Sequence, residues 1–531
     1  MNVTFNAPQQ ENEDAIGRVV STAGSKLVVL LLGDDVALAG VHMGSLVSIR
    51  STHGTVYGLV SSLNTKLPST PNEHAELKLA EISLLGEVAD QAVGGEFRRG
   101  VSRVPSLNAR VCAVEHEDMS IIYALPGRTT INIGTVYHDA RVPAQIGLDE
   151  LLSKHFAFLG MTGSGKSCGV TVVLKRILEH SSDAHILILD PHGEYARAFG
   201  PQAEILTIEN FRLPYWLFTF DEFTEVLFGK HKVEMAAEVM CLRDIVVAAK
   251  LRASEGDESR ITVDSPVPYQ FGNLIEQLDT AIGRLNNSRH LPTYLRLKEF
   301  LTTLRTDGRF EFMFDNSFRV HQNLAELLGR LFRVPACGKP IAIFDLSGIS
   351  SEVLNVVVGV VSRLAFDFAC YSRQRIPVLL VCDEAHRFAS QSAISDFALA
   401  KRALSQIATE GRKYGISLAV VSQRPSELAA TILSQCNTVV AFRTSNERDQ
   451  EVIRAAMSDA GPTLSVLPFL SNSEAVAIGE GVPVPMRLRF TELPESERPQ
   501  SSSAKFSERW NNADSATVAE LNRLVAAFRQ S

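Results

Sequence analysis

The feature that most constrains the fold is a complete phosphate-binding loop motif, G-x-x-x-x-G-K-S, at residues 160–167. It follows the apolar run HFAFLG and precedes a helical segment, the strand–loop–helix setting that distinguishes a true motif from a chance match. The glycines let backbone amides face phosphate oxygens, Lys166 neutralises charge between the β- and γ-phosphates, and the Ser167 hydroxyl is a Mg²⁺ ligand. The motif therefore predicts binding of ATP with Mg²⁺. The expected nucleotide-binding residues are Gly160, Thr162, Gly163, Ser164, Gly165, Lys166 and Ser167.

A second regular feature is a series of short apolar runs that alternate with helical segments from His155 onward. Runs without polar interruptions are typical of parallel strands covered on both faces, so we expect an α/β core over residues 146–494. Within it, the strand signal fades between about 211 and 335, where helical periodicity predicts an insertion. The runs are HFAFLG, HILILD, KPIAIFDLS, PVLLVCDE, ISLAVVSQ and NTVVAFRT.

The two ends of the chain differ from this core. Residues from about 15 to 145 contain short β-rich runs separated by glycine turns, which favours a small barrel as an N-terminal domain spanning 1–145. A generic β-domain without a special role is the alternative. After Pro494 the composition turns to serine, proline and glutamate, which predicts a linker and then an amphipathic terminal helix within residues 495–531.

Composition narrows the class of protein. The net charge of −8 excludes a globally basic nucleic-acid binder but allows local basic loops, because charge placement decides such binding. Seven dispersed cysteines without a CxxC pair indicate a reducing compartment and no structural zinc. The acidic N-terminal residues do not resemble a signal peptide, and no apolar run reaches the roughly 20 residues of a spanning helix. We expect a cytoplasmic protein that meets a membrane only through a partner.

An acidic pair, Asp383 and Glu384, follows the apolar run PVLLVC. Carboxylates at the C-terminal tip of a parallel strand lie in the crevice where open α/β sheets bind ligands. There Asp383 would bind Mg²⁺ through its water shell, and Glu384 would polarise the attacking water. Strand ends often carry acidic residues by chance, so this prediction gains its strength from the phosphate-binding loop.

Polar groups also end two other runs. Gln423 ends ISLAVVSQ and could contact the γ-phosphate or the attacking water; a strand-capping amide is the alternative. Asp190 and Glu194 belong to the turn after HILIL and could order water or metal. A turn built from Asp, Pro and Gly needs no such chemistry, so both interpretations of this turn stay open.

Basic residues gather between the acidic pair and the run ISLAVVSQ, and one more follows Gln423. A solvated helix face is the common position of single lysines and arginines. Only Arg412 is assigned a function, as an arginine finger that reaches the γ-phosphate of a neighbouring subunit. The residues are Lys401, Arg402, Arg412, Lys413 and Arg424.

Together these motifs resemble the HerA family, hexameric DNA translocases of the FtsK and HerA branch of RecA-like ATPases. The resemblance rests on LLSKHFAFLGMTGSGKS, ILDPHGEY, LLVCDEAHRF, TEGRKYGISLAVVSQRP and the early FRRGVSRVPSL, and it runs from the N-terminal region to the strand near Phe442. It implies a homohexamer with an N-terminal HAS-barrel, a RecA-like core interrupted by a helical bundle, and double-stranded DNA in a central channel.

The resemblance also implies partners and residue roles. Family members work with a NurA-like nuclease in end resection, or with sirtuin-like NAD-consuming enzymes and nucleases in antiphage defence. This chain departs from the family at Thr409, because a basic residue often precedes the EGRK stretch. The implied roles are Walker A for Lys166 and Ser167, Walker B for Asp383 and Glu384, sensor for Gln423, and finger for Arg412.

The leading hypothesis is therefore a ring motor that couples ATP hydrolysis to movement along duplex DNA, with an effector docked on the N-terminal barrel. It would act in DNA end processing or antiphage defence. The alternative is a nucleotide-regulated scaffold that assembles and activates the effector, with translocation incidental. A secretion-system ATPase of the same superfamily is disfavoured, because no membrane segment is expected.

Overall fold

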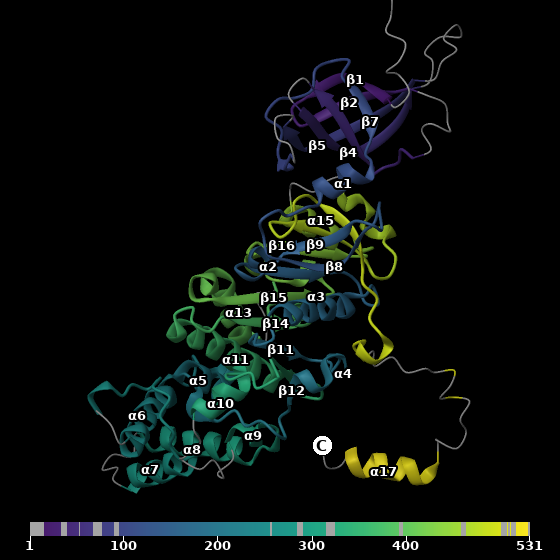
Figure 1. Cartoon of the computed structure of the whole chain (residues 1–531). Helices are drawn as coiled ribbons and strands as arrows, with labels where there is room; N and C mark the ends of the chain where they lie inside the picture. Colours follow the sequence, from purple (N-terminus) through teal and green to yellow (C-terminus); the bar gives the residue numbers. More distant parts are fainter. Residues whose placement is uncertain are drawn as a thin grey trace, which may run out of the picture.

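The computed structural model describes residues 15–500, Ser507, Trp510 and residues 517–528, with gaps. The expected linker after Pro494 lies largely outside these residues. A barrel, a central sheet covered by helices, and a helical insertion follow one another along the length of the molecule (Figure 1). The gaps are 33–39, 52–53, 67–76, 90–94, 255–257, 284–289, 315–323, 392–396 and 458–462.

The N-terminal barrel confirms the expected closed β-architecture. Six antiparallel strands follow the order β2-β1-β7-β3-β4-β5, and pairing of β2 with β5 closes the ring. Alternate side chains, such as Val19, Ile49 and Val111, are fully buried in its core. The short strand β6 (Arg98–Arg99) is added beside β5. The barrel strands are β1 (Ala15–Ala23), β2 (Lys26–Leu31), β3 (Leu46–Ser51), β4 (Gly54–Lys66), β5 (Leu77–Ala89) and β7 (Arg110–Ala113).

The boundary expected at residue 145 is placed too late in the chain. The last barrel strand ends at Ala113, and helix α1 (His116–Ile122) lies between the barrel and the core (Figure 1). Strands β8 (Thr130–Val136) and β9 (Pro143–Gly147) form a hairpin that joins the core sheet through β18 (Met486–Phe490). The hairpin has the same short, β-rich pattern as the barrel, and its partner strand comes more than 300 residues later.

The core contains one sheet of eleven strands in the order β12-β13-β11-β14-β15-β10-β16-β17-β18-β8-β9. The strands from β12 to β16 are parallel, and the remaining four are added antiparallel at one side. The core strands not yet given are β10 (His155–Leu159), β11 (Ile186–Asp190), β12 (Ala203–Leu206), β13 (Ile341–Asp345), β14 (Val378–Cys382), β15 (Ile416–Ser422), β16 (Cys436–Phe442) and β17 (Glu474–Gly479).

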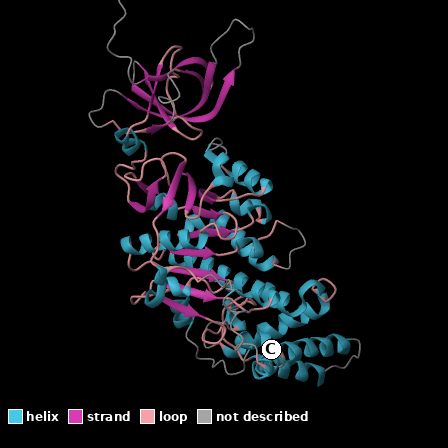
Figure 2. Cartoon of the chain, turned by 90° about the vertical axis from the view of Figure 1, so that its right-hand side faces the viewer, coloured by secondary structure: helices cyan, strands magenta, loops and turns pink. Residues whose placement is uncertain are grey.

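Helices cover both faces of the parallel strands, as the apolar runs predict (Figure 2). Phe156 and Phe158 of β10 belong to the cluster that contains α3 (Lys166–His180), whereas Ala157 and Leu159 belong to the cluster that contains α11 and α13. Helix α11 (Ser351–Ser372) is apolar and long enough to cross a membrane, but 78% of that apolar stretch is buried inside the protein. Such burial is typical of a core helix.

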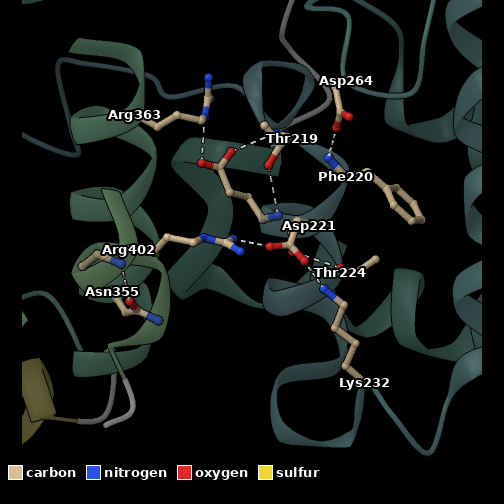
Figure 3. A network of polar contacts seen from close by, with 11 residues as sticks. Thr219, Phe220, Asp221, Thr224, Lys232, Asp264, Asn355, Arg363 and Arg402 are labelled. Carbon is tan, nitrogen blue, oxygen red and sulfur yellow. Dashed lines mark hydrogen bonds and ion pairs between the residues drawn. The ribbon is translucent and has the colours of Figure 1, made fainter. Parts of the chain in front are cut away.

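The expected helical insertion lies between β12 and β13. Polar contacts attach it to the core helices (Figure 3): Arg363 of α11 pairs with Glu222, and Arg402 of α13 pairs with Asp221. Glu222 also completes a capping box with Thr219 at the start of α5. The helices of the insertion are α5 (Phe220–Phe228), α6 (Ala236–Ala253), α7 (Phe271–Gly283), α8 (Leu291–Thr306), α9 (Glu311–Phe314) and α10 (Leu324–Phe332).

The remaining helices are short or peripheral, apart from α13, which packs in the core. Helix α17 is the expected terminal amphipathic helix, and the residues described in it are exposed. The helices are α2 (Leu148–Leu152), α4 (Ala196–Phe199), α12 (Ala385–Phe388), α13 (Ala398–Glu410), α14 (Ala430–Leu433), α15 (Glu447–Ala456) and α17 (Val518–Phe528).

Candidate functional site

The phosphate-binding loop joins β10 to α3 at the carboxyl edge of the sheet, as predicted. Gly160, Gly163 and Gly165 have φ values of +154°, +73° and +100°, a backbone region that side chains rarely occupy. A Cβ atom on Gly160 would lie 2.7 Å from the Cβ atom of Phe442 in β16. Glycine is therefore required both for the turn of the loop and for its close contact with the neighbouring strand.

The ammonium group of Lys166 is held inside this loop. Its Nζ donates to the carbonyl oxygen of Met161 at 2.9 Å, and the side chain is buried. Burial lowers the pKa of Lys166, while the nearby carboxylates of Glu384 and Asp383 oppose that shift. The cation is thus positioned within the loop by a backbone acceptor that a phosphate oxygen can replace.

Carboxylates from three strands converge beside the loop. Asp383 follows β14 and Asp190 ends β11, and burial raises the pKa of both carboxyl groups. Glu194 accepts a hydrogen bond of 2.9 Å from the Ser167 hydroxyl, so the turn after β11 belongs to the site. Asp345, which sequence reasoning missed, ends β13, and a Cβ atom on Gly193 would lie 3.3 Å from its carboxylate oxygens. Its position after a continuous apolar run was the available signal.

Gln423 connects the phosphate-binding loop to Glu384. Strand β15 lies between β10 and β14, which places Gln423 between the two motifs. Its side-chain oxygen accepts from the Thr162 hydroxyl, and its Nε2 donates to Oε1 of Glu384. Glu384 has a left-handed backbone with φ of +48°, and its side chain is buried. Burial raises the pKa of this carboxyl group, although the hydrogen bond from Gln423 opposes the shift.

His386 is a second missed residue and contacts the other oxygen of Glu384. Its Nδ1 lies 3.2 Å from Glu384 Oε2 and 3.2 Å from the Ser422 hydroxyl. Burial lowers the pKa of His386 to about 4, so the ring is neutral near pH 7. A proton on Nδ1 would let His386 donate to this carboxylate, which only accepts. His386 lies two residues after Glu384 on α12, within the string CDEAHRF, and nothing else in the sequence marks it.

Arg412 is not brought to this site. It is exposed and lies just before β15, at the amino edge of the sheet, where it lines a groove of about 830 Å³. The seven residues of β15 separate it from Gln423, a length of about 23 Å at the usual rise of a strand. Arg412 therefore cannot act on the phosphate-binding loop of its own chain.

The other basic residues of this region have individual positions. Arg402 pairs with Asp221 of the insertion, and Arg424 pairs with Glu427 three residues later. Lys413 is exposed next to Arg412, and Lys401 is half-buried on α13. The geometry gives none of these four a contact with the phosphate-binding loop.

Comparison with known proteins agrees with this site. The family described as "Helicase HerA, central domain" matches residues 131–365, which include the phosphate-binding loop. The chain is 29% identical over 438 residues to the DNA double-strand break repair helicase HerA of Pyrococcus furiosus, covering 74% of this chain and 75% of that protein. It is 25% identical over 418 residues to a probable helicase of Methanocaldococcus jannaschii, covering 77% and 75%.

A solved structure supports the fold. VirB4 of Thermoanaerobacter pseudethanolicus aligns with a TM-score of 0.50 at 16% identity, over 70% of this chain and 98% of that one. At this identity the structural alignment supports the fold alone, whereas the sequence matches support the similarity to helicases. A sheet with a complete phosphate-binding loop, a paired Asp–Glu at the next strand but one, and HerA helicases among the similar sequences lead to one assignment: the chain is a P-loop ATPase that is similar to HerA helicases.

Proposed function

We propose that this protein is an ATP-driven translocase for double-stranded DNA that works as a closed ring, for which the resemblance implies six subunits. The observation that carries the proposal is the separation of its site residues. Lys166, Glu384 and Gln423 meet at one edge of the sheet, while Arg412 lies at the other, so a site that uses Arg412 as its finger needs two copies of the chain. Head-to-tail contacts that bring opposite edges together form a closed ring when the rotation between neighbouring copies completes a full turn.

The proposed reaction follows from the contacts. Oε1 of Glu384 accepts a proton from water as the water oxygen attacks the γ-phosphorus, and the bond to the β–γ bridging oxygen breaks to release ADP and phosphate. Burial of Glu384 makes its carboxylate a stronger base than an exposed one. Gln423 must first release Oε1, which it does when its amide turns to the γ-phosphate or the water.

Magnesium fits the same edge. Asp383 is buried with Glu384, Asp190 and Glu194 nearby, and their mutual repulsion adds to burial in raising its pKa. A divalent cation would relieve this repulsion, and Ser167 and Asp383 are the residues that would hold it. When bound, Mg²⁺ neutralises charge on the β- and γ-phosphate oxygens.

The relatives' names supply the substrate class, since one is a DNA double-strand break repair helicase. The test is ATP turnover with and without duplex DNA, together with displacement of a protein roadblock from one DNA end. We expect DNA to stimulate turnover and the roadblock to be displaced in one direction. ATP-dependent activation of a bound effector without DNA stimulation would instead favour the nucleotide-regulated scaffold. The resemblance suggests a NurA-like nuclease or a sirtuin-like enzyme as effectors to test, with the barrel as docking surface.

A further inference from the structure

The segment that follows β18 runs along α3, beside the phosphate-binding loop. Strand β18 pairs antiparallel with β17, which pairs antiparallel with β16, so β18 is parallel to β10 and ends at the same carboxyl edge of the sheet. The segment then passes α3 and reaches α4 through the short helix η11 (Glu495–Glu497) (Figure 1). We call residues 491–500 the strap. It belongs to none of the sequence motifs, and the site described above does not use it.

Two contacts fasten the strap along α3. The carboxylate of Glu497 accepts a hydrogen bond of 2.6 Å from the Lys175 ammonium group. The backbone N–H of Gln500 donates to the carbonyl oxygen of Glu194 at 2.9 Å, and the carboxylate of Glu194 meets the Ser167 hydroxyl. Lys175 lies about two turns, or about 12 Å, beyond Ser167 on α3. The strap therefore runs from a point well inside the helix back toward the start of the helix.

Arg498 lies between these two contacts in the strap. Its Nε donates to the carbonyl oxygen of Leu493 at 2.9 Å, which fixes the side chain to the strap itself. Burial raises the pKa of the Cys168 thiol and the positive charge of Arg498 opposes that rise, so the guanidinium group lies near the first turn of α3. Arg498 is exposed, and no carboxylate among the described residues lies at ion-pair distance from it.

The first turn of α3 offers its backbone amides to a nucleotide. The N–H of Gly169 donates to the carbonyl oxygen of Gly165 at 2.9 Å, and the amides of the residues between them precede this first helical bond. Such amides bind phosphate groups, and a loop of this type cradles the α- and β-phosphates with them. Lys166 and the Ser167 hydroxyl are assigned to the β- and γ-phosphates and to Mg²⁺. The amide of Cys168, further into the helix, is then left for the α-phosphate.

We propose that Arg498 binds the α-phosphate of ATP, a contact that the strap adds to those of the phosphate-binding loop. Because Nε is held by Leu493, the terminal nitrogens Nη1 and Nη2 are the donors. A guanidinium group matches two phosphate oxygens with two parallel hydrogen bonds. ATP and ADP both carry an α-phosphate, so the contact holds the nucleotide before and after hydrolysis. The inference extends the ATPase activity and does not involve DNA.

The test compares nucleotide binding by the full chain and by Arg498→Gln. Dissociation constants for ATP and for ADP are measured by titration in the presence of Mg²⁺. Both should rise about 10- to 100-fold, because charge-assisted hydrogen bonds to a phosphate are lost. Arg498→Lys keeps the charge without the paired geometry, so its dissociation constants should lie between those of the parent and Arg498→Gln. Arg176→Gln is the matched control on α3, where Arg176 pairs with Glu179, and it should bind both nucleotides like the parent.

Sulfur substitution separates a direct contact from a structural role of Arg498. ATP with one non-bridging α-oxygen replaced by sulfur exists as two diastereomers, and sulfur is a weak hydrogen-bond acceptor. The parent should bind at least one diastereomer about threefold or more weakly than ATP, and Arg498→Gln should lose that discrimination.

Three results would overturn the inference. The first is an unchanged affinity of Arg498→Gln for ATP. The second is equal discrimination against sulfur in parent and variant, which would mean that Arg498 only shapes the strap. The third is a larger loss of affinity for ATP than for CTP with the sulfur effect intact, because Arg498 would then contact the base. DNA stimulation and roadblock displacement by the parent test the translocase proposal separately.

Discussion

The two edges of the core sheet hold charge in opposite ways. At the carboxyl edge, burial raises the pKa of Asp383 and Glu384 and lowers that of Lys166, so each group is moved toward its neutral form. At the amino edge, Arg412 is exposed to solvent beside an open groove. The carboxyl edge holds the phosphate-binding loop and the acidic pair. The amino edge holds Arg412, an exposed arginine with no phosphate-binding loop beside it. This difference is the basis for the proposal that catalysis needs a contact between two copies.

The largest effect is expected at the carboxyl edge from Lys166→Ala. It removes the charge placed between the β- and γ-phosphates, so ATP hydrolysis should fall by about 10³-fold or more. Steady-state phosphate release measures the loss. The unfolding temperature should stay close to that of the parent, because a buried cation is removed together with its desolvation cost.

Glu384→Gln is the matched variant at the same edge. It should bind ATP with nearly parental affinity and hydrolyse it at least about 100-fold more slowly, because an amide cannot accept the proton from water. A nucleotide-binding titration separates the two defects. Parental turnover by Glu384→Gln would show that the base lies elsewhere.

The amino edge is tested by mixing subunits. Arg412→Ala and Glu384→Gln should each be nearly inactive alone, since each removes one half of the same interfacial site. Random mixing in equal amounts creates an intact pair at about a quarter of the interfaces of a head-to-tail ring. Turnover should therefore reappear on mixing, to about a quarter of the parental rate if sites fire independently.

Mixing must be verified by co-purification of two differently tagged subunits. If Arg412 acted on its own chain, no arrangement would contain an intact site and turnover would stay at the single-mutant level. Continued inactivity in rings shown to be mixed would contradict a finger supplied by the neighbour, or show that all sites must fire in concert.

A smaller effect is expected from His386, which holds the second oxygen of Glu384. His386→Asn keeps a donor near the position of Nδ1, whereas His386→Gln moves it toward the position of Nε2. His386→Asn should have a kcat close to that of the parent. His386→Gln should lower kcat about tenfold, which corresponds to about 1.4 kcal/mol, with little change in KM for ATP. His180→Gln at the end of α3 is the control. Equal losses in both His386 variants would reduce its role to packing.

Much of the carboxyl edge could be predicted from the sequence because its residues follow continuous apolar runs. Asp383 and Gln423 come directly after a parallel strand, Lys166 follows one through the phosphate-binding loop, and parallel strands end at one edge. His386 and Asp345 escaped because their roles depend on which strands are neighbours. The sequence places Asp383 and Gln423 in order along the chain, but only the order β14-β15-β10 puts Gln423 between the two motifs.

The predicted boundary of the barrel was wrong for a related reason. The hairpin of β8 and β9 has the local pattern of a barrel strand pair, and its assignment depends on β18, far along the chain. Arg412 was predicted as an arginine finger, but the sequence did not show at which edge it lies. The start of β15 at Ile416 places Arg412 at the amino edge. Local pattern identifies strands, whereas pairing over long sequence distances decides which edge or domain they build.

The smallest predicted effect tests whether the helical insertion links the two edges. Helix α13 ends at Glu410, two residues before Arg412, and Asp221 of the insertion pairs with its Arg402 (Figure 3). Arg402 is 64% exposed, so solvent screens the pair and Asp221→Asn should cost less than about 1 kcal/mol of stability. Glu222→Gln, which disrupts the buried pair with Arg363, should cost about 3 kcal/mol and serves as the comparison. Turnover by Asp221→Asn should change by less than about twofold, because the packing of α13 against α11 remains. A much larger loss of turnover without a loss of stability would mean that the insertion sets the position of α13, and with it the distance between the cation at one edge and the site at the other.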